Sequence, residues 1–307
     1  MPFRKFSTVG FSLLTALGAM TQGHGQEFAV GDPLGSKNED GDRVEMSANV
    51  KVFGSFHFTE SCTFDPERNL ILSMNAGDRK DATRNDGYVS LINPDGSVHT
   101  AKWIGATRDG LELYTPLGSA IKEGILYTVD TGYIRLFDLI TGKPLRSFEV
   151  PGSTFLNGIA VADDGTIYAS NSRPEKRVYK VTAEGVPSIF VDGGKLKAPN
   201  GVAMDPDGNI VVANAGNLDV ITYNPNGDIV RVEEAAQKGS DGLVVLDDGT
   251  KYVSSVQHGT ISRIRPGQEA EIIASGIPRA ASMCYDSIQH QLVVPMNQNN
   301  ALAFVKL

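Results

Sequence analysis

One pattern that recurs about every forty residues constrains the fold of this 307-residue chain more than any other feature. Residues 157–171 read NGIAVADDGTIYASN, residues 200–214 read NGVAMDPDGNIVVAN, and residues 241–255 read DGLVVLDDGTKYVSS. With three looser copies there are six, and in chain order they begin at Glu60, Leu117, Asn157, Asn200, Asp241 and Ala281. Self-similarity at a fixed period indicates that each copy is one structural unit of a repeat architecture.

The spacing of the copies and their internal pattern together predict the architecture. The intervals between the six starting positions are 57, 40, 43, 41 and 40 residues, so we place an insertion in the first copy, at residues 77–86 (GDRKDATRND). Each copy reads as a strand, a tight turn and a second strand, and two more strand-like runs follow, as at 218–223 and 228–232. Four strands in each of six units, without helical periodicity, predict an all-β fold, a six-bladed β-propeller. The alternative, a β-sandwich with a second domain, leaves the repeat unexplained.

The two ends of the repeat region predict how the ring closes. Three strand-like runs follow Ala281, and they span residues 282–285, 291–294 and 301–306. We expect residues 44–53 to supply the missing fourth strand by pairing with residues 301–306, which removes a free sheet edge. The predicted propeller therefore spans residues 44–307.

The N-terminus has the layout of a secretory signal peptide. Arg4 and Lys5 form a basic start, residues 11–20 (FSLLTALGAM) are uncharged and largely apolar, and small residues follow at Gly23 and Gly25. We therefore expect residues 1–25 to be removed, residues 26–43 to form a linker, and the mature protein to be periplasmic or secreted, without a membrane span. An uncleaved N-terminal anchor is the alternative.

The charge of the chain limits its partners. Lys plus Arg number 28 and Asp plus Glu number 36, a formal net charge of −8, and removal of residues 1–25 would leave 26 − 36 = −10. Nucleic acids require a basic surface, so we expect no nucleic-acid partner. The field of an acidic protein favours cations over anions.

The starting residues of the six copies are the candidate site. In a propeller these positions converge on one rim of the central channel, and four of the six are oxygen donors: Glu60, Asn157, Asn200 and Asp241. Carboxylates with neutral amides suit a hard or borderline divalent cation, Ca²⁺ first, with Zn²⁺, Mn²⁺ or Mg²⁺ as alternatives. The other interpretation is that each residue caps its own turn. Residues at the ends of the second strands, Asn75, Asp130, Asn171 and Asn214, either line a pocket mouth or bond the turn backbone.

The chain resembles the regucalcin and gluconolactonase family of six-bladed propellers over about residues 44–307. Residues 60–64 (ESCTF) are similar to the opening Glu-Gly-Pro-x-Trp motif of that family, with the glutamate and an aromatic residue kept. The Asn-Gly and Asp-Gly motifs at Asn157, Asn200 and Asp241 follow in the family's order. The resemblance implies that Glu60, Asn200 and Asp241 bind the metal, that Asn157 contacts substrate or completes the metal shell, and that Asp241 is the general base.

One departure from the family bears on the substrate. Sugar lactonases of this family carry an arginine two residues before the first asparagine motif, and this chain has Phe155 there. An apolar ring removes a fork of hydrogen-bond donors, which favours a less polar lactone or ester. His258, after the second strand of the Asp241 copy, is a further candidate for a substrate contact.

These observations lead to two hypotheses of function. The first is a metal-dependent hydrolase of a small-molecule lactone or related ester, in which a metal-polarised carbonyl is attacked by water with Asp241 as general base. The second is a non-catalytic propeller that binds a ligand or a protein and holds a structural Ca²⁺.

The chain has two cysteines, Cys62 and Cys284, on the innermost strands of the first and last units. These units are neighbours across the closure, and an exported protein could oxidise the pair. Two separate buried thiols are the interpretation that we favour from the sequence.

Overall fold

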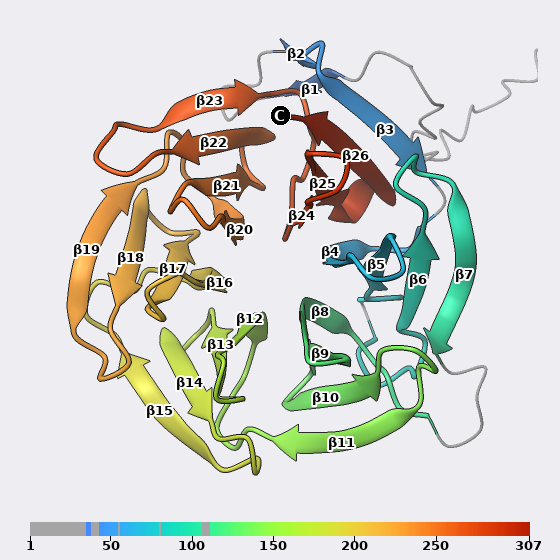
Figure 1. Cartoon of the computed structure of the whole chain (residues 1–307), viewed down its shortest axis with the longest axis vertical. Coiled ribbons are helices and arrows are strands. Elements are labelled where there is room, and N and C mark those ends of the chain that lie inside the picture. The colour runs from blue at the N-terminus through green and yellow to red at the C-terminus, as the bar shows by residue number, and fades with distance from the viewer. Residues whose placement is uncertain (1–34, 38–42, 55, 80, 106–110) are drawn as a thin grey trace, which may run out of the picture.

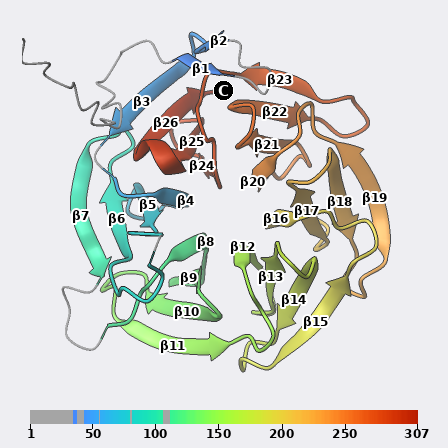
Figure 2. The same cartoon turned by 180° about the vertical axis from the view of Figure 1, so that it is seen from behind.

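The computed structural model describes residues 35–37, 43–54, 56–79, 81–105 and 111–307. The strands of these residues form six four-stranded antiparallel sheets in a ring (Figure 1), seen from behind in Figure 2. The prediction of an all-β, six-bladed propeller is confirmed. One short 3₁₀ turn, η1 (Asn297–Asn299), interrupts the strands, and within the described ranges no helix is long and apolar enough to cross a membrane.

Each sheet is one blade, and its first strand lies nearest the central axis (Figure 1). Blade 1 contains β4 (Thr59–Asp65), β5 (Leu70–Asn75), β6 (Tyr88–Ile92) and β7 (Val98–Gly105); blade 2 contains β8 (Pro116–Lys122), β9 (Ile125–Asp130), β10 (Tyr133–Asp138) and β11 (Pro144–Glu149); blade 3 contains β12 (Leu156–Val161), β13 (Ile167–Asn171), β14 (Arg177–Val181) and β15 (Pro187–Asp192). The predicted insertion lies between β5 and β6.

The second half of the ring repeats this plan. Blade 4 contains β16 (Pro199–Met204), β17 (Ile210–Asn214), β18 (Asp219–Tyr223) and β19 (Ile229–Glu234); blade 5 contains β20 (Ser240–Val245), β21 (Lys251–Ser255), β22 (Thr260–Ile264) and β23 (Glu271–Ala274); blade 6 contains β24 (Cys284–Asp286), β25 (Gln291–Met296), β26 (Ala301–Lys306) and β3 (Val50–Gly54).

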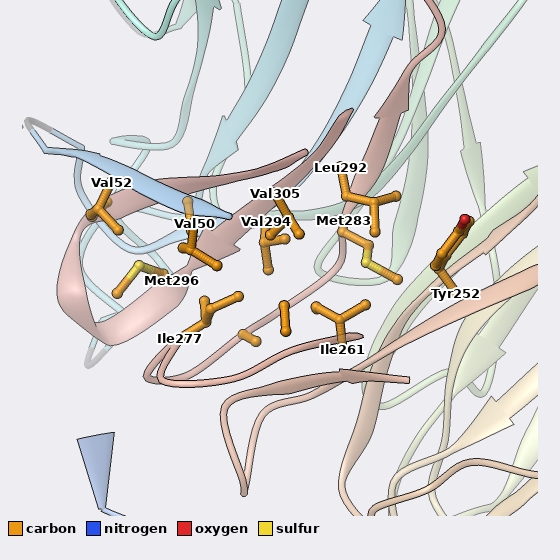
Figure 3. Packing of buried hydrophobic residues seen from close by; sticks show 14 residues of the cluster. Val50, Val52, Tyr252, Ile261, Ile277, Met283, Leu292, Val294, Met296 and Val305 are labelled. Atoms are coloured by element: carbon orange, nitrogen blue, oxygen red, sulfur yellow. The ribbon is translucent and has the colours of Figure 1, made fainter. Parts of the chain in front are cut away.

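The core lies between neighbouring blades. In Figure 3, Leu292, Val294 and Val305 of blade 6 pack toward Ile261 and Tyr252 of blade 5. Second strands such as β5 and β25 are buried along their whole length, because each is covered by a blade on either side. Outer strands such as β19 are mostly exposed. The ring is therefore held by apolar contacts that repeat from blade to blade.

The predicted tight turns join the first and second strands of the blades. Gly165 and Gly249 take φ values of +80° and +79°, in the left-handed region that glycine adopts without steric cost. Asp164 and Asp248, one residue earlier, each accept a hydrogen bond from a backbone N–H two residues further on. The Asp-Asp-Gly sequence is thus explained by the turn it forms.

The ring closes as expected, with a shorter strand. β3 pairs antiparallel with β26, from Gly54 opposite Ala301 to Val50 opposite Val305. The prediction of one strand over residues 44–53 is wrong at its start, because the backbone N–H of Val50 closes a turn onto the carbonyl of Ser47. Before that turn, β2 (Arg43–Glu45) pairs with β1 (Gly35–Lys37), inside the stretch expected to be a linker. The predicted signal peptide, residues 1–25, lies outside the described residues.

Blade 1 and blade 6 are also joined covalently. Cys62 and Cys284 form a disulfide with their Cα atoms 5.4 Å apart, across 222 residues of sequence. The favoured prediction of two separate thiols is wrong. The closure places β4 beside β24, and this Cα separation is the one that a disulfide spans.

Candidate functional site

The candidate residues occupy equivalent places at the inner edges of the blades. Each is the second residue of an innermost strand: Glu60 in β4, Leu117 in β8, Asn157 in β12, Asn200 in β16 and Asp241 in β20. At this point in all five blades the pairing with the second strand shifts register. Such irregularities free a residue from the ladder and redirect its side chain, and they are frequent beside binding sites. Ala281 precedes β24 in the sixth blade.

The glycine that follows the anchor residue in four blades has a packing role. A Cβ atom added to Gly118, Gly158 or Gly201 would lie 2.2, 2.1 or 2.6 Å from the carbonyl oxygen of the next blade's anchor residue, which is Asn157, Asn200 or Asp241 respectively. A side chain of any size would therefore push neighbouring inner strands apart. The repeated Asn-Gly and Asp-Gly motifs combine a variable polar residue with a glycine that the close approach of the blades requires.

We call Glu60, Asn200 and Asp241 the polar cluster: all three are buried at the inner edges of their blades, Asn200 bonds Asp241, and the Glu60 carboxylate acts electrostatically on Asp241. The Asn200 amide Nδ2 donates to Asp241 Oδ2 at 3.1 Å, and Asn297 Nδ2, from η1, donates to Glu60 Oε2 at 3.0 Å. No more than 6% of the surface of Glu60, Asn200 or Asp241 is exposed. The other side-chain oxygens of the central pair, Asn200 Oδ1 and Asp241 Oδ1, are buried and accept no hydrogen bond from the described residues.

The two carboxyl groups of this cluster, those of Glu60 and Asp241, repel each other when both are ionised. Burial raises the pKa of Asp241 well above its ordinary value, and the Glu60 carboxylate raises it further. Burial also raises the pKa of Glu60, although the Arg79 guanidinium and the Asn297 hydrogen bond act in the opposite direction. Two carboxylates at one buried place are unfavourable when both are ionised, unless positive charge is brought to them.

The cluster fits a divalent cation. Two carboxylates and an amide oxygen match the donors that Ca²⁺ and similar hard cations take, and the unsatisfied oxygens of Asn200 and Asp241 are those that a cation would satisfy. Among the described residues no group of three or more His, Cys, Asp and Glu side chains could hold a metal. A metal here would therefore depend on the amide of Asn200 beside the two carboxylates, as the sequence predicts.

Asn157 belongs to the same ring of strands but bonds within its own blade. Its amide Nδ2 donates to Ser172 Oγ at 3.3 Å, and Ser172 Oγ donates to the carbonyl of Pro199 at 2.7 Å. Asn157 is buried, with 5% of its surface exposed. Its predicted place in the metal shell or against substrate stays a prediction.

The polar residues at the ends of the second strands bond the backbone. Asn171 Oδ1 accepts from the N–H groups of Thr154 and Phe155 at 2.9 and 2.8 Å. The side-chain oxygens of Asn75, Asp130 and Asn214 likewise accept from backbone N–H groups of the segments before β4, β8 and β16. All four residues are fully buried. Of the two interpretations that the sequence allowed, the turn-bonding one therefore holds.

Phe155 lines a pocket near the rim. The pocket has a volume of about 370 Å³ and lies between blades 2 and 3, with Leu117, Leu156 and Arg79 also in its wall. A larger hollow of about 620 Å³ lies at the closure seam beside Phe53 and contains none of the candidate residues. The 370 Å³ pocket reaches the rim at Leu117, but its described lining includes none of the four oxygen donors Glu60, Asn157, Asn200 and Asp241.

His258 lies in the turn between β21 and β22, where its backbone N–H donates to Ser255 Oγ at 3.1 Å. It is not among the residues that line the 370 Å³ pocket. Its assignment as a substrate contact stays a prediction.

The sequence analysis did not identify Asn297, which bonds Glu60, or Arg79, whose charge acts on Glu60. Asn297 follows the second strand of the last blade, in an Asn-Gln-Asn-Asn run without an equivalent in the other copies. Arg79 belongs to the insertion of the first copy. The repeat pattern aligns equivalent positions only, so residues from unique segments are invisible to it. The one available signal was the long first interval, since an insertion on one blade places extra side chains over one face.

The comparisons with known proteins support the fold. No model of a known protein family matches the sequence, and no curated protein matches it. A gluconolactonase structure from Xanthomonas campestris is similar at 18% identity and a TM-score of 0.60, with 91% of this chain and 100% of that one covered.

Other similar structures have different activities. A virginiamycin B lyase from Staphylococcus aureus, in complex with quinupristin, matches at 13% identity and a TM-score of 0.55, with 84% of this chain and 99% of that one covered. A chain of the nidogen/laminin complex matches at 16% identity and a TM-score of 0.56, with 67% and 75% covered. At these identities the likeness shows the fold alone, because propellers host unrelated functions.

Proposed function

We propose that this protein is a metal-dependent hydrolase of a lactone or related ester. The observation that carries the proposal is the buried cluster of Glu60, Asn200 and Asp241, in which two side-chain oxygens lack hydrogen-bond partners among the described residues. The likeness to a gluconolactonase structure supports the same chemistry, and the resemblance of the Asn-Gly and Asp-Gly motifs adds to it.

Each residue of the cluster has a proposed role in binding the metal, in orienting Asp241 or in proton transfer. Glu60, Asn200 and Asp241 would hold one divalent cation, with Ca²⁺ as the first choice, and that cation would polarise the substrate carbonyl and lower the pKa of a bound water. Asn200 holds Asp241 Oδ2 in place, so the carboxylate is oriented before substrate arrives. Asp241 would accept the proton of the attacking water.

The disulfide supports the proposed location. Disulfides persist in oxidising compartments, and Cys62–Cys284 would be stable outside the cytoplasm. We therefore propose, with the basic and apolar N-terminal segment as the second support, that the protein is exported to the periplasm or secreted.

The test of the activity is hydrolysis of a panel of γ- and δ-lactones and aryl esters, by protein treated with chelator and by the same protein after Ca²⁺, Zn²⁺, Mn²⁺ or Mg²⁺ is restored. We expect turnover of at least one substrate class that chelation abolishes and one of the metals restores. Turnover that survives chelation would contradict the metal dependence. No turnover of any substrate would favour a binding propeller, for which the likeness to the nidogen/laminin complex is the supporting observation.

A further inference from the structure

The insertion in blade 1 supplies Arg79, which lies against Phe58 and Phe155 near the rim. Arg84 pairs with Asp78 and with Asp86 at 3.3 Å each, which ties the two ends of the loop together. Asn85 fixes the loop to the next segment, since its Nδ2 donates to the carbonyl of Leu111 at 2.7 Å and its Oδ1 accepts from the N–H of Leu113 at 2.8 Å. These bonds hold residues 78 and 84–86, which flank Arg79 in the insertion, against one another and against residues 111–113.

The guanidinium of Arg79 is held against two aromatic rings. Its guanidinium carbon lies 5.0 Å from the centre of the Phe58 ring and 5.4 Å from that of Phe155. Within the described ranges, Arg79 makes no ion pair and no hydrogen bond. Stacking on ring faces leaves the N–H groups at the edge of the guanidinium available to a ligand.

The pocket that Arg79 lines borders the strand that carries Glu60. Its wall residue Leu117 accepts, at its carbonyl oxygen, a hydrogen bond from the Oγ of Ser61, the residue that follows Glu60 in β4. A group bound by Arg79 would therefore lie in a pocket next to one of the proposed metal ligands.

The pocket that Arg79 lines is suited to an anion with an apolar body. Leu117, Leu156 and Phe155 line it together with the hydroxyl-bearing residues Thr115, Thr131, Ser153 and Thr154. Of its described lining residues, Arg79 alone is charged. The guanidinium of Arg173 also stacks on Phe155, at 4.6 Å from the ring centre.

We infer that Arg79, on the blade 1 insertion, is the anion-recognising residue of this pocket, and that the substrate is a lactone or ester that carries a carboxylate. The inference rests on the proposed function and names its substrate class. The expectation of a less polar substrate, drawn from Phe155 alone, is thereby changed, because the ring at that position supports a guanidinium supplied from another blade. A volume of about 370 Å³ suits a small molecule of this kind.

The test uses probes that contain no lactone or ester bond. Tetrahydrofuran-2-carboxylate and tetrahydrofuran-2-carboxamide share one ring and differ in charge, and their affinities are measured by ligand-observed NMR titration of chelator-treated protein. We expect the wild type to bind the carboxylate at least tenfold more tightly than the amide, because a charged partner strengthens a hydrogen-bonded contact. In Arg79→Gln this ratio should fall to about one, and in Arg79→Lys it should be partly retained.

Arg146→Gln is the matched control. Arg146 stacks on Phe148 at 4.6 Å from the ring centre, on the outer side of blade 2, and also donates to the carbonyl oxygens of Ala183 and Glu184. Its replacement removes the same charge and a guanidinium–aromatic contact away from the pocket. We expect it to leave the ratio unchanged. A ratio that persists in Arg79→Gln, or wild-type protein that binds neither probe or both equally, would overturn the inference. Because binding is read without turnover, a failure of the proposed hydrolysis would be seen separately, in the lactone panel.

Discussion

At the scale of single residues, Asp241 is assigned two tasks, a metal ligand and a proton acceptor, while Glu60 is assigned one. The two carboxylates occupy equivalent positions on blades 1 and 5, and both are buried. They differ in their neighbours, since Glu60 is bonded by Asn297 and Asp241 by Asn200. Variants that keep shape but remove charge can therefore separate the two tasks.

Asp241→Asn should reduce turnover more than metal binding. Asparagine keeps the size and one donor oxygen but cannot take a proton, so we expect kcat on the substrate found in the lactone panel to fall by about a hundredfold or more. Metal content by elemental analysis should fall less. A variant that loses all metal, or one that keeps full kcat, would contradict the assignment of Asp241 as the general base.

The sequence was sufficient to find the rim residues, because six aligned copies bring equivalent positions together without any structure. It could not assign the partners of those residues. Arg79 and Asn297 come from unique segments, and their approach to Glu60 depends on the path of one loop and one 3₁₀ turn. Phe155 illustrates the same limit, since one of the two guanidinium groups that stack on it, that of Arg79, comes from a different blade.

At the scale of the elements, the close approach of the inner strands is the feature that sets the geometry of the rim. The glycines after the anchor residues allow it, and the register shifts of the strands accompany it. The repeat pattern predicted the strands and turns well, because alternating apolar residues and Asp-Gly turns are local signals. It misjudged the start of β3, since the turn at Ser47 has no strong signature in the sequence.

Gly158→Ala should destabilise the fold. The added Cβ would lie 2.1 Å from the carbonyl oxygen of Asn200, a backbone atom that cannot rotate away, so we expect a loss of about 1–3 kcal/mol in the free energy of unfolding. Gly132→Ala is the control, because the nearest described atom to its Cβ would be Ser153 Oγ at 3.7 Å. Equal denaturant midpoints for the two variants would contradict the packing account.

The aspartates of the two turns, Asp164 and Asp248, should make the Tm of the protein depend on pH. Hydrogen bonds from the N–H and hydroxyl groups of Thr166 and Thr250 lower the pKa of Asp164 and Asp248 below the ordinary value of 3.8. The pKa of each aspartate is lower in the native state than in the unfolded state. The stabilisation is therefore fully present above the unfolded-state pKa and is lost as the pH falls through the native pKa. The double variant with Asn at both positions should show a smaller drop in Tm between pH 6 and pH 3 than the wild type. An unchanged drop would show that these turns do not contribute.

At the scale of the whole molecule, two links close the ring of blades. β3 completes blade 6 through β26, and the disulfide joins β4 to β24. The first link was predicted because a blade lacked a strand. The second was not, because a pair of cysteines on neighbouring strands allows a bond without requiring one, and their Cα separation is known only from the structure.

Removal of the disulfide should weaken the ring. The Cys62→Ala/Cys284→Ala double variant should lose about 2–5 kcal/mol in the free energy of unfolding, because the bond restricts a loop of 222 residues in the unfolded chain. Reductant should lower the denaturant midpoint of the wild type and leave that of the variant unchanged. If the double variant and the oxidised wild type unfold at the same midpoint, the disulfide does not stabilise the closure.

Calorimetric titration of chelator-treated protein with Ca²⁺, Zn²⁺, Mn²⁺ and Mg²⁺ measures whether Glu60, Asn200 and Asp241 hold one divalent cation. We predict one equivalent of at least one of these metals per wild-type chain, and an affinity at least tenfold weaker in Glu60→Gln, because a charged ligand is lost. Glu112→Gln, which removes an exposed carboxylate paired with Arg135, should bind as the wild type does. Absence of binding to the wild type, or undiminished affinity in Glu60→Gln, would contradict the account.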